Sequence, residues 1–159
     1  NIMNNKTGIY VIYNGIVSFT STVLWGGNAV TGAIQKNLGL TPEEAKKIKE
    51  EAGYHDSKDT KKVLAAVQDT VGQIQQEIAK VHSYWIDHGE GRKEVTKIIL
   101  CGVDSQLVGL MSHISPDSKI PVEVANIWSN AFSNDHYIPP ISRDESLDYA
   151  VATGLALPQ

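Results

Sequence analysis

Glycine turns beside predicted helices are the residues of this chain whose type and spacing could support chemistry. Gly26-Gly27 ends a β-rich segment, and Gly102 follows the apolar run of residues 96–101. Such a turn exposes backbone N–H groups that bind anions, and the missing Cβ lets a phosphate or an adenosine lie against the main chain. The alternative is a strand-to-helix connection that needs only backbone flexibility. A lone Gly-Gly is a weak signal, so both interpretations stay open.

The other chemistry-bearing residues form no recognisable catalytic or metal-binding set. Asp104 follows the Gly102 turn and is interpreted as the N-cap of a helix rather than as a catalytic base. His82 and His88 are six residues apart and do not share a helix face, and the other three histidines lie in unrelated segments. No metal site is therefore predicted. Ser-His-Asp catalysis is not predicted either, because no nucleophile elbow is present.

Composition indicates one ordinary globular domain. The chain has 159 residues, of which 42% are hydrophobic and 20% charged, with a net charge of −4. This size buries a substantial core, and the charge argues against a nucleic-acid binder. No apolar run approaches the roughly 20 residues that cross a bilayer, so no direct membrane insertion is expected. Cys101 has apolar neighbours and is expected to be a buried thiol; with no signal peptide at the start, this favours the cytoplasm.

A β-hairpin is predicted near the N-terminus. Residues 9–13 are apolar on both faces, as in a strand buried on both sides. Asn14-Gly15 is typical of a type I′ turn, and residues 16–24 return as one long strand or two short ones. The interpretation we favour for residues 1–6 is a frayed end, which would make Thr7 an ordinary strand residue. The chain begins without an initiator, which indicates an excised domain.

Three helices are predicted to follow the hairpin. The first starts after Gly26-Gly27 with Asn28 as its N-cap. Thr41-Pro-Glu-Glu44 is a capping box with proline at the first helical position, so a second helix starts there and ends at Gly53. A third helix of about 30 residues opens near residues 56–57 and ends before Gly89. One of its faces carries an apolar stripe: Val67, Val71, Ile74, Ile78, Val81 and Trp85.

The last part of the chain changes to a strand–helix–strand–helix order. Residues 96–101 predict a buried strand, 104–114 a helix and 121–125 a short strand, with an irregular segment at 126–142. A final helix is expected to place one face against a sheet through Leu147, Ala150, Val151, Gly154 and Leu155. Together with the hairpin and the helices, this is an α/β order.

These segments, in this order, resemble one half of an actin-like nucleotide-binding protein. The similarity is carried by residues 25–31, 40–49, 100–110 and 147–157. It points to the PilM-like family of type IV pilus assembly proteins, related to the cell-division protein FtsA, and covers nearly the whole chain. The resemblance implies an α/β, actin-like ATPase (ribonuclease H-like) fold: a mixed sheet with flanking helices. Residues 1–39 and 95–159 would form subdomain 2A, and residues 40–94 an inserted helical subdomain 2B.

The resemblance also implies where a nucleotide would bind. Matched residue by residue, the family pattern implies that one wall of a cleft for ATP and Mg²⁺ is formed by Thr7, Gly26, Gly27, Lys49 and Gly102. Lys49 matches a lysine that contacts the ribose.

Several positions depart from the family pattern. Asn1-Ile2-Met3 stands where the family has an Asp-Ile-Gly turn, so the carboxylate that positions a metal-bound water is missing. Lys46 replaces the glutamate that accepts a hydrogen bond from the ribose, and Val103 replaces a glycine. These departures predict weak or absent hydrolysis, and an isolated half is not expected to be active because it holds only one wall of the cleft.

The function implied by the resemblance is that of a cytoplasmic component, peripheral at the inner membrane, of the type IV pilus assembly platform. It would bind ATP or carry a degenerate nucleotide site. It would dock a PilN-like inner-membrane protein through the half of the molecule not present here, and self-association is a further possibility. An FtsA-like division protein, or a kinase of the same superfold, is the alternative, because fold alone does not settle function.

Overall fold

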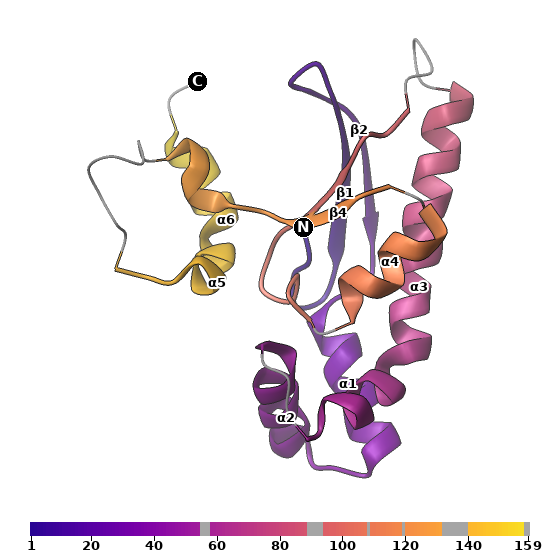
Figure 1. Cartoon of the computed structure of the whole chain (residues 1–159), viewed down its shortest axis with the longest axis vertical. Coiled ribbons are helices and arrows are strands. Elements are labelled where there is room, and N and C mark those ends of the chain that lie inside the picture. The colour runs from indigo at the N-terminus through magenta and orange to yellow at the C-terminus, as the bar shows by residue number, and fades with distance from the viewer. Residues whose placement is uncertain (55–57, 89–93, 108, 119, 132–139, 158–159) are drawn as a thin grey trace.

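The N-terminal hairpin forms as the sequence predicts, but the prediction that its first strand is buried on both sides is wrong, because Tyr10 and Ile12 are exposed. The computed structural model describes residues 1–54, 58–88, 94–107, 109–118, 120–131 and 140–157 (Figure 1). Strands β1 (Thr7–Tyr13) and β2 (Ile16–Val23) pair antiparallel, with an irregularity in register between Val11 and Ile12. Asn14 and Gly15 join them with φ values of 52° and 77°, the positive pair that a type I′ turn requires.

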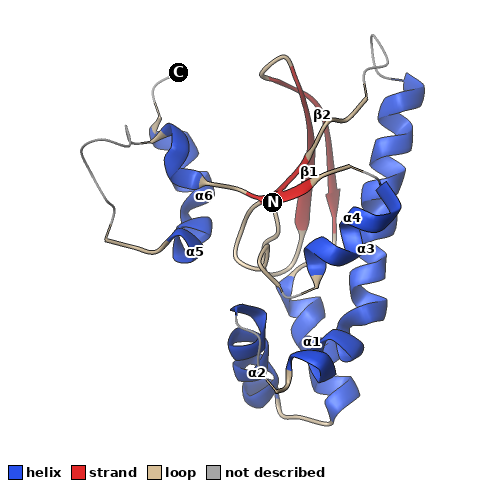
Figure 2. Cartoon of the chain, in the orientation of Figure 1, coloured by secondary structure: helices blue, strands red, loops and turns tan. Residues whose placement is uncertain are grey.

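Three helices follow, as Figure 2 shows: α1 (Gly27–Leu38), α2 (Pro42–Tyr54) and α3 (Thr60–His88). The predicted capping box of α2 is present, because the Thr41 amide donates to the Glu44 carboxylate at 2.9 Å and the Glu44 amide donates back to the Thr41 hydroxyl at 3.3 Å. The N-cap of α1 is Gly26, so the expectation of Asn28 as cap is wrong. Helix α3 begins at Thr60, slightly later than predicted, and residues 55–57 lie outside the described part.

Helix α3 is the central packing element of the described chain. It runs along one side of the hairpin and also contacts α1, α2 and α4 (Leu110–Ser118) (Figure 1). Its predicted apolar stripe is buried at Val67, Val71, Ile74, Val81 and Trp85. The remaining residue of the stripe, Ile78, is partly buried and still packs against the core. Trp85 and Tyr84 contact the hairpin rings Tyr13 and Phe19, with ring centroids 6.2 Å and 5.0 Å apart respectively. None of the described helices combines the length and apolar character needed to cross a bilayer.

The C-terminal part contains a second pair of strands. β3 (Ile98–Leu100) pairs parallel with β4 (Val122–Val124). β3 is shorter than the predicted strand at 96–101, and the prediction that this strand is buried is wrong at Ile99, which is exposed. Strands therefore run in both directions, as in a mixed sheet, but the described residues form two separate two-stranded sheets. The predicted helix at 104–114 is wrong at its start: residues 102–106 form turns, Gly109 has φ 83°, and α4 begins only at Leu110.

The chain then continues through η1 (Ile127–Asn130), α5 (Arg143–Ser146), η2 (Leu147–Tyr149) and α6 (Ala150–Ala156). Leu147 is buried, as predicted. Helix α6 itself has no buried residue, and Leu155 is 83% exposed, so the prediction that this helix packs on a sheet is wrong. Figure 1 shows α5 and α6 beside the hairpin, on the side away from α3.

The first six residues are ordered rather than frayed. The Ile2 side chain is only 2% exposed, and Ile2 forms an antiparallel bridge with Thr7. The Ile2 amide also donates to the Cys101 carbonyl at 2.7 Å, which links the N-terminus to the end of β3. The preferred prediction of a frayed end is therefore wrong, because long-range backbone hydrogen bonds hold this segment. Cys101 is half-buried, not buried as expected.

Candidate functional site

Residues 1–6, called the N-terminal turn from here on, lie directly over the start of α1. The Gly27 amide donates to the Met3 carbonyl at 3.1 Å, and the Asn28 amide donates to the Asn4 carbonyl at 2.8 Å. The first N–H groups of a helix are normally the ones that bind a phosphate. Here these two donors are satisfied by the chain itself.

The three predicted glycines lie around this turn, and each leaves room for a neighbouring atom of the chain. A Cβ at Gly26 would lie 2.1 Å from the Met3 carbonyl oxygen, and a Cβ at Gly102 would lie 2.1 Å from the Ile2 carbonyl oxygen. A Cβ at Gly27 would lie 1.7 Å from Oδ2 of Asp104. Gly102 also has φ 97°, which disfavours any other residue. The glycines therefore permit close approach of the protein to itself.

A buried ion pair completes the cluster. Lys49 Nζ on α2 lies 2.7 Å from Asp104 Oδ1, and the two side chains are only 14% and 6% exposed. The same ammonium donates to the Gly27 carbonyl at 3.5 Å. The pair thus connects α2 with the turn after β3 and with the first residue of α1. Lys46, three residues earlier, is 70% exposed and lies 3.9 Å from Glu50, so it is directed away from this cluster.

Asp104 is the site residue that sequence reasoning missed. Assigning it as an N-cap hid its role, because no helix starts there. Its second carboxylate oxygen, Oδ2, is buried and has no hydrogen-bond partner among the described residues, and the same holds for Ser105 Oγ. The signal that could have revealed it was an acidic residue directly after a glycine turn, in a chain whose Lys49 was expected to face the same cleft.

Thr7 forms no hydrogen bond with Lys49 or Asp104 but is buried beside the residue before the glycine pair. Its side chain is 4% exposed, and Oγ1 donates to the Trp25 carbonyl at 2.8 Å, so it joins the start of β1 to the residue before the glycine pair. Of the five predicted residues, Gly26, Gly27, Lys49 and Gly102 therefore surround the N-terminal turn, and Thr7 supports it from within.

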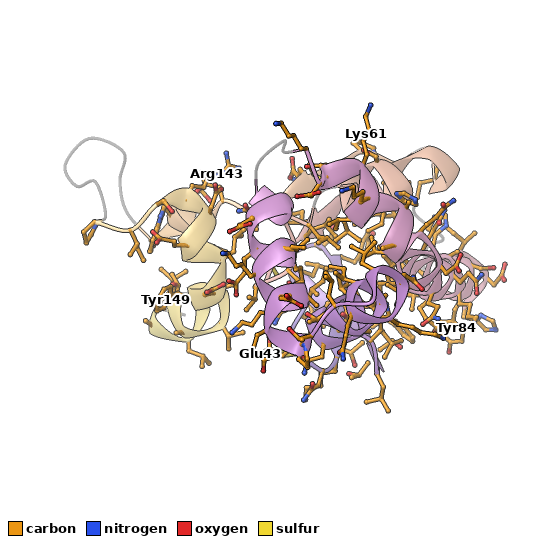
Figure 3. The ribbon with its side chains drawn as sticks, turned by 90° about the horizontal axis from the view of Figure 1, so that it is seen from below. Glu43, Lys61, Tyr84, Arg143 and Tyr149 are labelled. Carbon is orange, nitrogen blue, oxygen red and sulfur yellow. The ribbon has the colours of Figure 1, made fainter. Side chains whose placement is uncertain are left out.

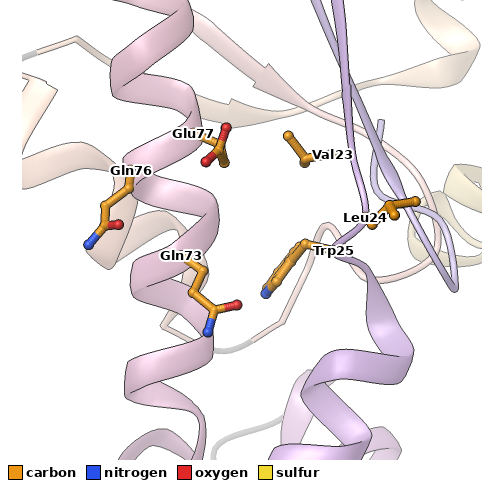
Figure 4. Close-up of a pocket in the computed structure, with 6 residues that line it drawn as sticks. All are labelled: Val23, Leu24, Trp25, Gln73, Gln76 and Glu77. Carbon is orange, nitrogen blue, oxygen red and sulfur yellow. The ribbon is translucent and has the colours of Figure 1, made fainter.

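A separate hollow lies on the other side of Trp25, between the end of β2 and α3 (Figure 4). It is lined by Val23, Leu24, Trp25, Gln73, Gln76 and Glu77. Glu77 is its charged residue, and this carboxylate pairs with Lys80 at 2.6 Å. No cation from the lining faces this hollow, so it does not suit a phosphate group.

Among the residues that the structure describes, Asp104 is the only charged residue that is buried. Figure 3 shows Glu43, Lys61, Arg143 and the ring of Tyr84 at the periphery of the ribbon. In the parts of the chain that the structure describes, no three histidine, cysteine or carboxylate side chains are close enough together to hold a metal ion.

The surroundings of Asp148 on η2 raise the pKa of its carboxyl. Burial raises the pKa of the Asp148 carboxyl, and the nearby Asp104 and Glu145 charges raise it further. A carboxyl with a raised pKa in the folded state contributes less stability as the pH rises above its ordinary value of 3.8.

We therefore expect Asp148→Asn to be more stable than the wild type at pH 7. The gain should stay below about 1 kcal/mol, because water screens a largely exposed group. It should disappear as the pH falls below the ordinary carboxyl pKa. Urea unfolding at pH 7 and at acidic pH measures both effects, and a variant less stable than the wild type at pH 7 would contradict this account of Asp148.

Sequence comparison identifies the family. The profile of the type IV pilus assembly protein PilM matches residues 1–159. The chain belongs to the PilM family. A solved PilM-PilN type IV pilus biogenesis complex contains a chain that is 19% identical, with a TM-score of 0.75 over 98% of this chain and 43% of that one. The ethanolamine utilization protein EutJ from Carboxydothermus hydrogenoformans is 20% identical, with a TM-score of 0.62 over 78% of this chain and 42% of that one.

These similarities confirm the predicted actin-like α/β fold. The chain spans less than half the length of each of these two solved chains. Proteins of this fold generally bind nucleotide and Mg²⁺, but the cluster around Lys49 does not fit a nucleotide phosphate as it stands. The first amides of α1 are bonded to carbonyls, the ammonium is neutralised by Asp104, and an unpaired carboxylate oxygen lies against Gly27.

Proposed function

We propose that this chain is one half of a PilM-type component of the type IV pilus inner-membrane platform. The observation that carries the proposal is the family match along the whole chain, residues 1–159. The protein would lie in the cytoplasm, at the inner membrane, and dock a PilN-like membrane protein. The similarity to a chain of a PilM-PilN complex supports this partner.

We further propose that the protein works as a scaffold rather than as an ATP-hydrolysing enzyme. The departures at Asn1 and Lys46 remove two polar groups that the family directs at a nucleotide. Lys49, which matches a nucleotide-binding lysine, is bonded to Asp104 instead. In the proposed division into subdomains, this pair connects α2 of the inserted segment 40–94 with the turn after β3, so the wall is held together by protein contacts alone.

Binding of the full-length protein to the cytoplasmic tail of its PilN-like partner tests the docking role. A peptide of that tail should bind in calorimetric titration, with similar affinity in the presence and absence of Mg-ATP. A scrambled peptide of the same composition is the control. Absence of binding by a folded protein would overturn the docking role, and docking that requires ATP, or steady ATP turnover, would overturn the scaffold.

A further inference from the structure

The structure assigns a new role to Asp104: we propose that it holds Lys49 in an internal ion pair that closes the nucleotide wall, so that a nucleotide has to compete with Asp104 for this lysine. Asp104 would thus decide whether this half of the protein can accept a nucleotide. The inference rests on the proposed function only in taking the full-length PilM-type protein as the molecule to test.

The contact between the two side chains spans the wall. Lys49 comes from α2 and Asp104 from the turn after β3, and their charged atoms meet directly at 2.7 Å. Two segments that the family resemblance assigns to a nucleotide, through Lys49 and Gly102, are therefore in direct contact. Because the pair is almost completely buried, water screens its attraction poorly. A ligand that binds Lys49 must first separate these charges.

The surroundings of Asp104 oppose an incoming phosphate. Oδ2 is buried and has no partner among the described residues, and it lies close to the Cα of Gly27 at the start of α1. The positive end of the helix dipole stabilises a carboxylate in this position. Asp104 thus already supplies the negative charge that the α1 terminus and Lys49 would otherwise attract from a nucleotide.

Removing the carboxylate should therefore open the wall to nucleotide. Asparagine has nearly the same shape as aspartate but cannot neutralise the ammonium, so Asp104→Asn leaves Lys49 available. We expect the full-length Asp104→Asn protein to bind Mg-ATP at least tenfold more tightly than the wild type. Asp144→Asn is the matched control, because Asp144 is an exposed carboxylate that contacts Gln106 in the same turn, at 2.8 Å, without contacting Lys49.

Isothermal titration of Mg-ATP into the three proteins gives the decisive comparison. Tighter binding by Asp104→Asn, with Asp144→Asn unchanged from the wild type, supports the competition. Equal or weaker binding by Asp104→Asn overturns it, and so does failure of all three proteins to bind. Asp104→Ser replaces Asp104→Asn if circular dichroism shows that the latter is unfolded. Docking of the partner peptide is measured on the same samples, so loss of the pilus role and loss of the competition are told apart.

Discussion

Replacing Lys49 with methionine is expected to lower the free energy of unfolding by about 3–5 kcal/mol. Methionine keeps most of the apolar stem but removes the ammonium, so the Asp104 carboxylate, whose side chain is only 6% exposed, is left buried without its counter-charge. Urea unfolding of the full-length protein, followed by circular dichroism, measures the change.

Two further variants separate this effect from a general one. Lys47→Met lies on the same helix, but its ammonium is 75% exposed and pairs with Glu51 at 3.8 Å, so we expect a loss of less than about 1 kcal/mol. The double variant Lys49→Met/Asp104→Asn should recover part of the stability, because it leaves no buried charge unpaired. Equal losses in Lys49→Met and Lys47→Met would show that the pair contributes no more than a surface contact.

Elements with local signals were predicted from the sequence. The Asn14-Gly15 turn, the Thr41 capping box and the apolar stripe of α3 depend on neighbouring residues, and the structure contains all three. The start of α4 was predicted too early, at residue 104 instead of Leu110, because the apolar spacing after Gly102 also fits a helix. Residues 102–106 instead form turns, and the φ of 83° at Gly109 does not suit a helix.

The candidate site was predicted in part, for a similar reason. The family resemblance pointed to the glycines and to Lys49, and the structure brings these residues together around one turn. It could not reveal what fills the space between them. The contacts of Ile2 with Cys101, and of Lys49 with Asp104, join residues far apart in the chain. The frayed-end prediction failed because it left out the tertiary contacts of residues 1–6, such as the hydrogen bond from the Ile2 amide to the Cys101 carbonyl.

Because the N-terminal turn is ordered, the glycines have a different role from the ligand-binding role that a glycine motif suggests. A glycine turn can serve a ligand or the chain itself, and the two uses look identical in sequence. Here the atoms nearest to the missing Cβ positions are Met3 O, Ile2 O and Asp104 Oδ2. In this structure, therefore, the close approach is made by the protein, and the glycines should be sensitive to substitution even without nucleotide.

Gly102→Ala is accordingly expected to destabilise the protein by about 3 kcal/mol. Alanine at a φ of 97° is strained by about 1–3 kcal/mol. Its Cβ would also meet the Ile2 carbonyl oxygen at 2.1 Å, which is main chain and cannot rotate away. The N-terminal turn would have to move, and partial exposure of the buried Ile2 side chain adds to the loss, since burying such a side chain contributes about 1.5–3 kcal/mol.

Three glycine variants distinguish the two causes. Gly39→Ala has a φ of 67° but open space around its Cβ, so it should show strain alone, about 1–2 kcal/mol. Gly26→Ala has extended backbone, and its Cβ would collide with main-chain atoms of Met3 and Asn4, so it should show the steric effect alone. Gly32→Ala lies inside α1 with open space and should stabilise the protein by about 0.5–1 kcal/mol. Urea unfolding of the full-length variants gives the series. If Gly102→Ala lost no more stability than Gly39→Ala, the N-terminal turn would not be held against β3 in solution.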